Sequence, residues 1–505
     1  MPREYHDAAP ELAAKLRARR DQLPEAARSY YSVLFAVADV HGSDADDQAT
    51  ITRVGDGGVE IELRSGGGDP YFRRRFDGRD TREIRVYLHG GNDHAVVRGA
   101  ARHSIPVRVV GGNGTNTFAD SSLVAGRSRP TRFHDAGTVS GVSYGPDTAF
   151  NRRPWVRLFG EAAPPGKDYG TRIVPTASVS TGRGLGIAPE VGFKRYRYGF
   201  GYVPYATMLQ VELGYSTALQ GFELEFEGDK RFESARHHLR ADVLLSEIEV
   251  GEFRGLGNQN SGEQSDFFRV HQKQYTAYPA LAYAFGAESD ISLGPTVRYV
   301  VTDSTPDRFI SETRPYGFGR FGQAGLQLKV EHDNRDDTGF PRRGGTVELT
   351  ASAYPALWSV ETPYQEITAV ATHHAPLPGG SVLAFRLGGK KLFGNFPYFD
   401  AAFLGGSSSL RTVDRQRYAG DASVYGSGEV RVPLGKFGFL LPWDAGLIGF
   451  ADVGRVYVDG RSAGGWHSGV GGGFWLGVLS PKTSVTVLLT NSPDRRLLLG
   501  LGVDY

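Results

Sequence analysis

The feature that most constrains this chain is a long series of segments in which apolar and polar residues alternate. About sixteen such segments follow one another from residue 171 to residue 505, most of them ten or more residues long. Alternation with a period of two is typical of a β-strand with one apolar and one polar face. A strand of about 9–11 residues can cross a membrane, and bacterial barrels contain even numbers of strands. The pattern therefore predicts a mainly β chain in which residues 169–505 form an antiparallel transmembrane β-barrel of about sixteen strands.

The composition agrees with a membrane protein built from strands, and it excludes several other classes. The mean hydropathy is −0.32, because alternating strands keep this value low, and no run of about 18 apolar residues predicts a transmembrane helix. Lys and Arg number 57 against 56 for Asp and Glu, a formal net charge of +1, which argues against nucleic acid as a partner. The chain has no cysteine, so disulfides and thiolate metal sites are excluded.

The last segment shows the alternation most clearly. Apolar residues occupy every odd position from Leu497 to Tyr505, where the sequence ends on an aromatic residue. A strand edge in lipid leaves backbone groups without hydrogen-bond partners, which is costly. We therefore expect this strand to close the barrel against the first one, near residues 171–180.

The N-terminal part of the chain has a different pattern. Residues 1–47 are predicted to be helical, with an apolar stripe that includes Leu12 and Leu16, and Pro24 is expected to open a second helix. Residues 121–168 are rich in proline, glycine and charge, which predicts a linker. The N-terminus lacks the apolar core of a signal peptide, so we expect the chain to be a fragment or a processed form of a longer precursor.

Residues 48–120 contain short strands separated by glycine turns. Two Gly-Gly pairs, at 90–91 and 111–112, lie about 21 residues apart, and each follows a β-branched run. Such a repeat indicates stacked rungs of a small β-solenoid. The stretch GGNGTNTF partly resembles a calcium-binding repeat, but Asn116 stands where an aspartate is expected. Plain turn chemistry is therefore the preferred interpretation.

Three histidines, His89, His94 and His103, raise the alternative of a metal site in this region. No carboxylate–histidine spacing typical of zinc accompanies them, so they are interpreted as polar turn residues. We predict neither a metal nor a cofactor for this chain.

Several motifs within the predicted barrel carry a resemblance to a known family. In order, they are FRGLGN at 253–258, EHDNRDDTGFPRRGG at 331–345, LGGSSSLRTV at 404–413 with GEVRVPL at 428–434, and FADVG at 450–454. Together they resemble the motifs of the outer-membrane insertase and translocase superfamily, the bacterial surface antigen proteins of BamA/TamA type. The positions that match the family patterns are Asp333, Arg335, Asp336, Pro341, Gly344, Gly405, Gly406, Leu410, Phe450 and Gly454.

The resemblance implies a specific ion pair. In that family the loop arginine reaches into the barrel and pairs with the aspartate of the strand motif, which corresponds here to Arg411 and Asp452. The residues agree with this, because a carboxylate cannot face lipid cheaply and Phe450 shares the strand face of Asp452. Glu429 shares a face with Arg431 and is expected to join the network. A bidentate guanidinium–carboxylate contact would fix the loop in place.

The sequence departs from the family pattern in two places. Thr412 and Val413 replace a glycine and an aromatic residue at the loop tip, so the tip is expected to turn differently. The POTRA domains that usually precede such a barrel are not recognisable in residues 1–168. Residues 39–41 and the stretch GGNDH imitate parts of a metallophosphoesterase signature, but the other ligands of a two-metal centre are missing. The chain is therefore predicted not to be an enzyme.

The resemblance implies a protein of the bacterial outer membrane that inserts or translocates protein or lipid. Its N-terminal region would lie in the periplasm, and a seam between the first and last strands would act as a lateral gate. The expected partners are outer-membrane lipid, a polypeptide or lipid cargo, and the barrel assembly machinery, which would bind the C-terminal strand signal at Tyr505. Two alternatives stay open: a barrel that anchors or exports an N-terminal module, and a passive pore.

Overall fold

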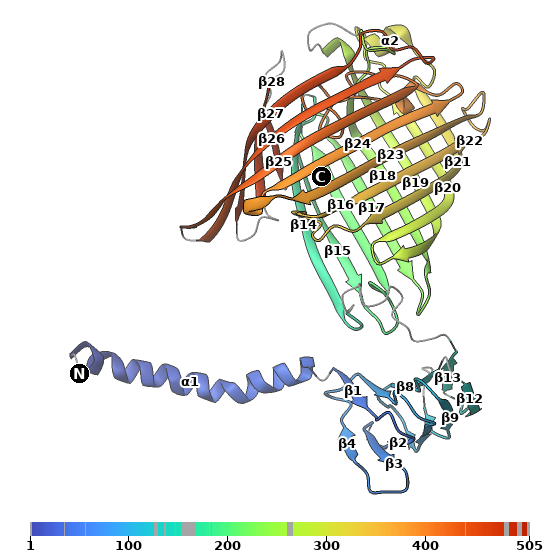
Figure 1. The fold of residues 1–505 in the computed structure, drawn as a ribbon, viewed down its shortest axis with the longest axis vertical. Coiled ribbons are helices and arrows are strands. Elements are labelled where there is room, and N and C mark those ends of the chain that lie inside the picture. Colours follow the sequence, from blue (N-terminus) through green and yellow to red (C-terminus); the bar gives the residue numbers. More distant parts are fainter. Residues whose placement is uncertain are drawn as a thin grey trace. The chain divides into compact units, whose positions relative to one another are not determined.

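The structure of the chain is a computed structural model with two compact units, Met1–Arg157 and Leu158–Tyr505 (Figure 1). It describes residues 3–34, 36–55, 57–125, 130–135, 138–146, 148–152, 167–182, 184–259, 266–439, 441–478, 484–491 and 497–501. Each unit is described by itself.

The first unit begins with one long helix, α1 (Arg3–Leu34), which continues through Pro10 and Pro24. The prediction of two helices is therefore wrong. In an exposed helix the carbonyl group left free by a proline can bond to water, so the proline weakens the helix without ending it. The apolar stripe of α1 is exposed, with Leu16 at 57%. Within the described residues, no helix combines the length and the apolar character needed to cross a membrane.

The prediction that residues 1–47 are all helical is also wrong at its end. Strand β1 (Val37–His41) follows the helix and pairs in parallel with β5 (Glu83–Tyr87). Ala38 and Val40 are buried while Asp39 between them is exposed. Burial at every second residue is typical of a strand. In so short a segment, the apolar residues of the sequence alone do not distinguish a strand from the last turn of a helix.

Short strands form the rest of the first unit. They are β2 (Asp47–Arg53), β3 (Val59–Ser65), β4 (Phe72–Phe76), β6 (His94–Arg98), β7 (Ala100–Ala101), β8 (Val107–Val110), β9 (Thr115–Asp120), β10 (Leu123–Val124), β11 (Thr131–His134), β12 (Thr138–Ser143) and β13 (Thr148–Asn151). One sheet has the order β1-β5-β8-β11-β13, and a second has the order β12-β9-β6-β2-β3-β4. Apolar side chains such as Ile51, Ile84 and Phe118 form the core cluster of this unit.

From β5 onwards, successive rungs of this unit are offset by 23 or 24 residues, as the pairings of Ile84 with Val107 and of Val107 with Thr131 show, except the last, where Thr131 pairs with Thr148 at an offset of 17. The expected period of about 21 residues is therefore wrong. The Gly-Gly pairs at 90–91 and 111–112 do not occupy equivalent positions in the two rungs. The residue that stacks on Gly91 is Gly114, which lies outside the second pair. A Cβ atom at Gly114 would lie 1.9 Å from the carbonyl oxygen of Gly91, so only glycine lets these turns stack so closely.

The predicted linker over residues 121–168 is wrong in its first half. Strands β11, β12 and β13 lie within it and extend the two sheets by a further rung. Phe133 of β11 is fully buried against Phe118, with ring centroids 4.9 Å apart. Proline and charge in the sequence masked this short strand. Residues 153–166 lie outside the described part of the chain.

The second unit is a sixteen-stranded sheet, within the described residues, in which every strand pairs antiparallel with the next. The strands are β14 (Thr171–Gly182), β15 (Gly186–Arg197), β16 (Thr207–Ser216), β17 (Gly221–Arg231), β18 (His237–Glu252), β19 (Arg269–Gly286), β20 (Ser289–Thr302), β21 (Arg320–Asp333), β22 (Gly344–Tyr354), β23 (Tyr364–Pro376), β24 (Val382–Phe393), β25 (Ala422–Phe439), β26 (Leu441–Tyr457), β27 (His467–Val478), β28 (Ser484–Asn491) and β29 (Leu497–Leu501). Short helical turns lie at Asp266–Phe268, α2 (Phe309–Thr313), Pro378–Gly380 and Tyr398–Asp400. The predicted fold class is confirmed, and Figure 1 shows the sheet curving round into a barrel.

The two faces of the barrel wall differ as the alternation predicts. On β19 and β20, Leu281 and Leu293 pair with each other and are both more than half exposed. Their neighbours Ala282 and Ser292 also pair and are both 1% exposed. The apolar face is therefore the outer one, and the polar residues line the interior.

The two ends of the barrel carry different connections. Short connections at 198–206, 232–236, 287–288, 334–343 and 377–381 lie at one end, here called the turn end. Longer connections at 253–268, 303–319 and 394–421 lie at the other, here called the loop end, where Figure 1 shows α2. Among the described residues β14 pairs only with β15, and β29 only with β28, so the expected closure of the last strand against the first is not seen there. Tyr505 lies outside the described residues.

A buried lumenal ion-pair network as the candidate functional site

The connection between β24 and β25 folds into the barrel and brings Arg411 to the inner wall. Leu404 and Leu410 of this connection are fully buried and pack with Tyr425 and Val456 of the wall. Gly405 has a φ of 124°, and a Cβ atom there would lie 2.0 Å from the carbonyl oxygen of Asp414. The turn therefore requires glycine, which explains one of the family positions in the sequence.

Arg411 is held at the wall by charge-assisted hydrogen bonds. Its Nη2 and Nε atoms donate to the two carboxylate oxygens of Asp452 over 2.7 and 3.1 Å, and its backbone N–H donates to the same group over 2.9 Å. Its Nη1 donates to Oε2 of Glu429 over 2.5 Å. All three side chains are at most 3% exposed. The structure thus brings together the three residues that the sequence singled out.

Two more side chains complete the network. The Cζ atom of Arg411 lies 3.8 Å from the centroid of the Phe450 ring, a cation–π contact. Arg431 donates from Nε to Oε1 of Glu429 over 2.7 Å. Two guanidinium groups therefore face the two carboxylates of Glu429 and Asp452, and the buried charges balance, as charges removed from water must.

Glycines on β27 make room for this network. Gly469 pairs with Asp452 and Gly471 with Phe450. A Cβ atom at Gly469 would lie 2.3 Å from Oγ1 of Thr412, and one at Gly471 would lie 2.4 Å from the ring of Phe450. Thr412, where the family has glycine, is buried at 2% exposure and occupies the space over Gly469. The Thr412 side chain at the loop tip is therefore accommodated by the absence of a side chain at Gly469.

The other family positions lie in two connections of the barrel. Asp333, Arg335, Asp336, Pro341 and Gly344 belong to the 334–343 turn or its flanks, where Asp333 and Arg335 form an ion pair of 2.6 Å. Asp336 accepts backbone N–H bonds from Arg342 and Arg343. At the loop end, Gly257 of the FRGLGN stretch bonds to the carbonyl oxygen of Ala419 over 2.8 Å. These two motifs thus shape the connections at both ends of the barrel.

The sequence analysis missed a second buried charge in the same connection. Asp400 is 1% exposed and forms an ion pair with Arg298 of β20. It also accepts hydrogen bonds from the Tyr364 hydroxyl over 2.6 Å and from Gln323 Nε2 over 2.9 Å. The sequence feature that could have predicted this site is an aspartate within the aromatic stretch FPYFD. An acidic side chain buried among aromatic residues needs a cationic partner. The connection is therefore anchored at two points, Asp400 and Arg411.

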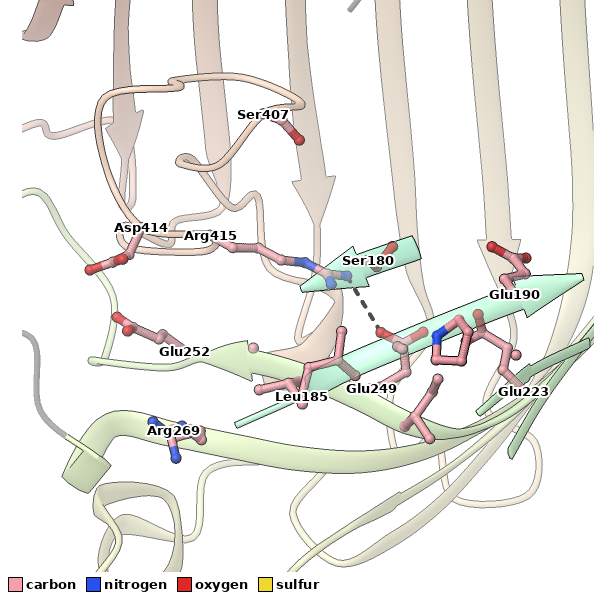
Figure 2. A pocket seen from close by; sticks show the side chains of 16 residues that line it. Ser180, Leu185, Glu190, Glu223, Glu249, Glu252, Arg269, Ser407, Asp414 and Arg415 are labelled. Carbon is pink, nitrogen blue, oxygen red and sulfur yellow. Dashed lines mark hydrogen bonds and ion pairs between the residues drawn. The ribbon is translucent and has the colours of Figure 1, made fainter. Parts of the chain in front are cut away.

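A cavity of about 480 Å³ lies between this connection and the wall formed by strands β14 to β19. Figure 2 shows Arg415 reaching from the connection towards Glu249 of β18, at 3.4 Å. Glu190, Glu223 and Glu252 also line it. The lining is net acidic, because its acidic side chains outnumber the two guanidinium groups of Arg269 and Arg415.

Metal-ligating side chains come together at one place within the described residues. The carboxylates of Glu190, Glu212 and Glu225 lie within 4.8 Å of one another on the inner wall. The sequence analysis did not single them out. Among the histidines singled out in the sequence, His89 contacts His41. Nε2 of His89 lies 3.0 Å from Nδ1 of His41, and the two rings stack.

Comparison with known proteins gives a match in sequence. A model described as the Omp85 superfamily domain matches residues 205–486. No curated protein matches the chain. Among solved structures, BamA from Haemophilus ducreyi lacking POTRA domains 1–3 is 14% identical, with a TM-score of 0.45 over 66% of this chain and 69% of that chain. CdiB from Escherichia coli is 11% identical, with a TM-score of 0.44 over 66% of this chain and 61% of that chain.

Proposed function

Because the chain belongs to the Omp85 superfamily, we propose that it inserts polypeptide cargo into the bacterial outer membrane or translocates it across that membrane. Barrels of this superfamily sit in the bacterial outer membrane, act in protein insertion or translocation, and are not enzymes. The finer proposal concerns the route. Cargo would engage the barrel at the seam between β14 and β29, and the braced 394–421 connection would keep the rest of the barrel rigid while the seam opens.

The buried network of Arg411, Asp452 and Glu429 is the observation that carries this proposal. A buried ion pair is costly to assemble and strongly destabilising to break, so a connection anchored by one is held in a single position. A passive pore needs no such anchor across its interior. A braced wall beside a seam that lacks backbone pairing among the described residues suits a lateral gate, because the seam can open while the strands next to it hold their position.

The orientation of the barrel follows from its connections. Outer-membrane barrels have short periplasmic turns and longer extracellular loops. The turn end, where β14 begins, would therefore face the periplasm, and so would the N-terminal unit that precedes β14. The acidic cavity beside Glu249 would lie in the upper half of the lumen, under the loop end.

Reconstitution of the full chain tests the proposal. Liposomes of phosphatidylethanolamine and phosphatidylglycerol would hold the purified protein, and a urea-unfolded outer-membrane barrel precursor would be the cargo. We expect the wild type to speed the appearance of heat-resistant, folded precursor over empty liposomes. Arg411→Ala and Asp452→Ala should slow it, whereas Arg461→Ala, a change of the same type in an exposed loop, should not. A wild-type rate equal to that of empty liposomes would contradict the proposed activity.

A second candidate function rests on the N-terminal unit, whose stacked rungs form a separate compact body. A barrel that anchors or exports this unit would expose it at the cell surface. Protease added to intact cells distinguishes the two candidates. Protection of residues 36–125 supports insertion or translocation with a periplasmic N-terminal unit, and cleavage there supports display.

A further inference from the structure

The 334–343 turn does more than connect β21 to β22, because Phe340 at its tip is buried inside the barrel. Phe340 is 8% exposed and belongs to a cluster with Ile448, Trp475 and Leu488. Its ring centroid lies 4.9 Å from that of Trp475, at an interplanar angle of 58°, a favourable geometry for an aromatic pair.

This contact crosses the barrel interior. Trp475 is on β27, and in the sheet order β23, β24, β25 and β26 lie between β22 and β27. No neighbouring-strand register can therefore bring Phe340 to Trp475. The turn itself must carry the ring across the lumen to the strands β26, β27 and β28, which precede the seam.

The turn is built to present Phe340. Oδ1 of Asp337 accepts the backbone N–H groups of Gly339 and Phe340 over 2.9 and 3.0 Å. Oδ1 of Asp336 accepts those of Arg342 and Arg343 over 3.0 and 3.2 Å. Two aspartates thus fix the backbone on both sides of the aromatic residue, as Asx turns do. The sequence motif that marks this turn therefore has a structural purpose inside the barrel.

The same patch of wall receives the turn from one end and the 394–421 connection from the other. The Cζ atom of Arg431 lies 5.9 Å from the ring of Phe340, and Arg431 is bonded to Glu429, a partner of Arg411. Phe450, which lies under Arg411, belongs to the same cluster as Phe340. Gly446 leaves room for the indole of Trp475, since a Cβ atom there would lie 2.4 Å from Nε1.

We propose that Phe340 is a positioning residue that ties β26–β28 to the 334–343 turn and sets the position of Arg431 beneath the Arg411 network. The turn end and the loop connection are then mechanically coupled through one wall. This goes beyond the proposed function, because it concerns how the barrel is braced and holds whatever the cargo is.

Tryptophan fluorescence of the purified full chain in detergent gives the first test. The chain has five tryptophans, so the Trp475 signal is the difference between each variant and the same variant carrying Trp475→Phe. Phe340→Ala should shift this signal to longer wavelength, because the indole gains contact with water. Phe340→Leu should restore most of the wild-type signal, and Arg342→Ala, in the same turn but exposed, should leave it unchanged.

A double-mutant cycle separates coupling from simple packing. The temperature at which the folded band disappears in heat-modifiable gels would be measured for Phe340→Ala, Arg411→Lys and the double variant. Phe340→Ala is used here in place of Phe340→Leu, because only the alanine removes the packing contact of the ring. We expect the double variant to lose less than the two single losses added together, since contacting networks are not additive. Additive losses, or a Trp475 signal unchanged in Phe340→Ala, would overturn the proposal. Neither measurement involves transport, so these outcomes are independent of the proposed insertase activity.

Discussion

At the scale of single residues, the barrel interior is organised by charges that are buried in matched sets. Arg411 and Asp452 are both almost completely buried, with Glu429 and Arg431 completing the set. A group buried this deeply is stabilising only with its partner present. Three predictions follow from buried groups of this kind.

Removing one partner of the network should be costly. In Asp452→Ala the Arg411 guanidinium is left with an unbalanced buried charge, and we expect a loss of about 3–5 kcal/mol in folding stability. The measurement is the temperature at which heat-modifiable gel mobility is lost. Arg461→Ala serves as the control for a surface arginine. Unchanged mobility in both Asp452→Ala and Arg411→Ala would remove the ion pair from the account.

Thr412 and Gly469 should behave as a coupled pair. Gly469→Ala places a methyl group in the space of the Thr412 side chain, and overpacking of this kind costs about 1–3 kcal/mol. Thr412→Gly restores the family residue and frees that space, so Thr412→Gly/Gly469→Ala should be more stable than Gly469→Ala alone. If Thr412→Gly gives no relief, the proposed compensation is wrong.

The N-terminal unit should respond to pH through two buried groups. Burial, together with the nearby carboxylates of Asp47, Asp46 and Asp135, raises the pKa of Asp93 from 3.8 to about 7. Burial beside the Arg108 guanidinium lowers the pKa of His134 from 6.5 to about 3. A raised acid pKa stabilises the fold at low pH, so the Asp93 contribution is lost as pH rises from about 4 through 7. The lowered histidine pKa acts in the opposite sense, and its contribution is lost as pH falls from about 6.5 towards 3.

Hydrogen exchange of residues 57–125 in the full chain measures this dependence. Asp93→Asn should make protection at pH 8 approach that at pH 6, because the amide does not ionise. The wild type should lose protection over the same interval. Equal pH profiles for the two proteins would contradict the role of Asp93.

At the scale of elements, the 394–421 connection depends on two anchors rather than one. Asp400→Ala removes the partner of Arg298 at the start of the connection while leaving the Arg411 tip in place. We expect local loosening, seen as faster hydrogen exchange in residues 394–404 with little change at 410–421. Glu361→Ala, a change of an exposed acid in another connection of the loop end, is the control. Equal loosening along the whole connection would mean that it opens as one unit.

The elements also show which parts of the fold the sequence can and cannot predict. The barrel strands are long and each buries one face, so period-two alternation identifies them reliably. Strand β1 is short and follows a helix, and the spacing of its apolar residues fits both the period of a helix and that of a strand. Strands such as β11 lie in a proline-rich stretch, and their burial depends on rungs stacked far away in sequence. The motif positions indicated the Arg411 network, whereas Asp400 and Phe340 are buried by partners that lie far away in sequence and come near only when the sheet curves round.

At the scale of the whole molecule, a braced wall lies directly beside a seam. Strands β25 to β28 are braced from inside by Arg411 and Phe340, while β14 and β29 share no backbone pairing among the described residues. Under the proposed function, the barrel would open at this seam while the braced strands beside it keep their shape. In the proposed mechanism, incoming polypeptide would pair with the two seam edges, because backbone groups at a strand edge are costly to leave unpaired in lipid.

The most direct test of this central claim is to lock the seam. The chain has no cysteine, so a fixed cysteine at Leu499 in β29 can be combined with single cysteines along β14, and oxidation reports which pair crosslinks. The matched control is Tyr275→Cys/Tyr299→Cys, a registered pair across β19 and β20. The account predicts that the oxidised seam pair stops precursor insertion into liposomes, that reduction restores it, and that the oxidised control stays active. Full insertion with the seam locked would contradict the account.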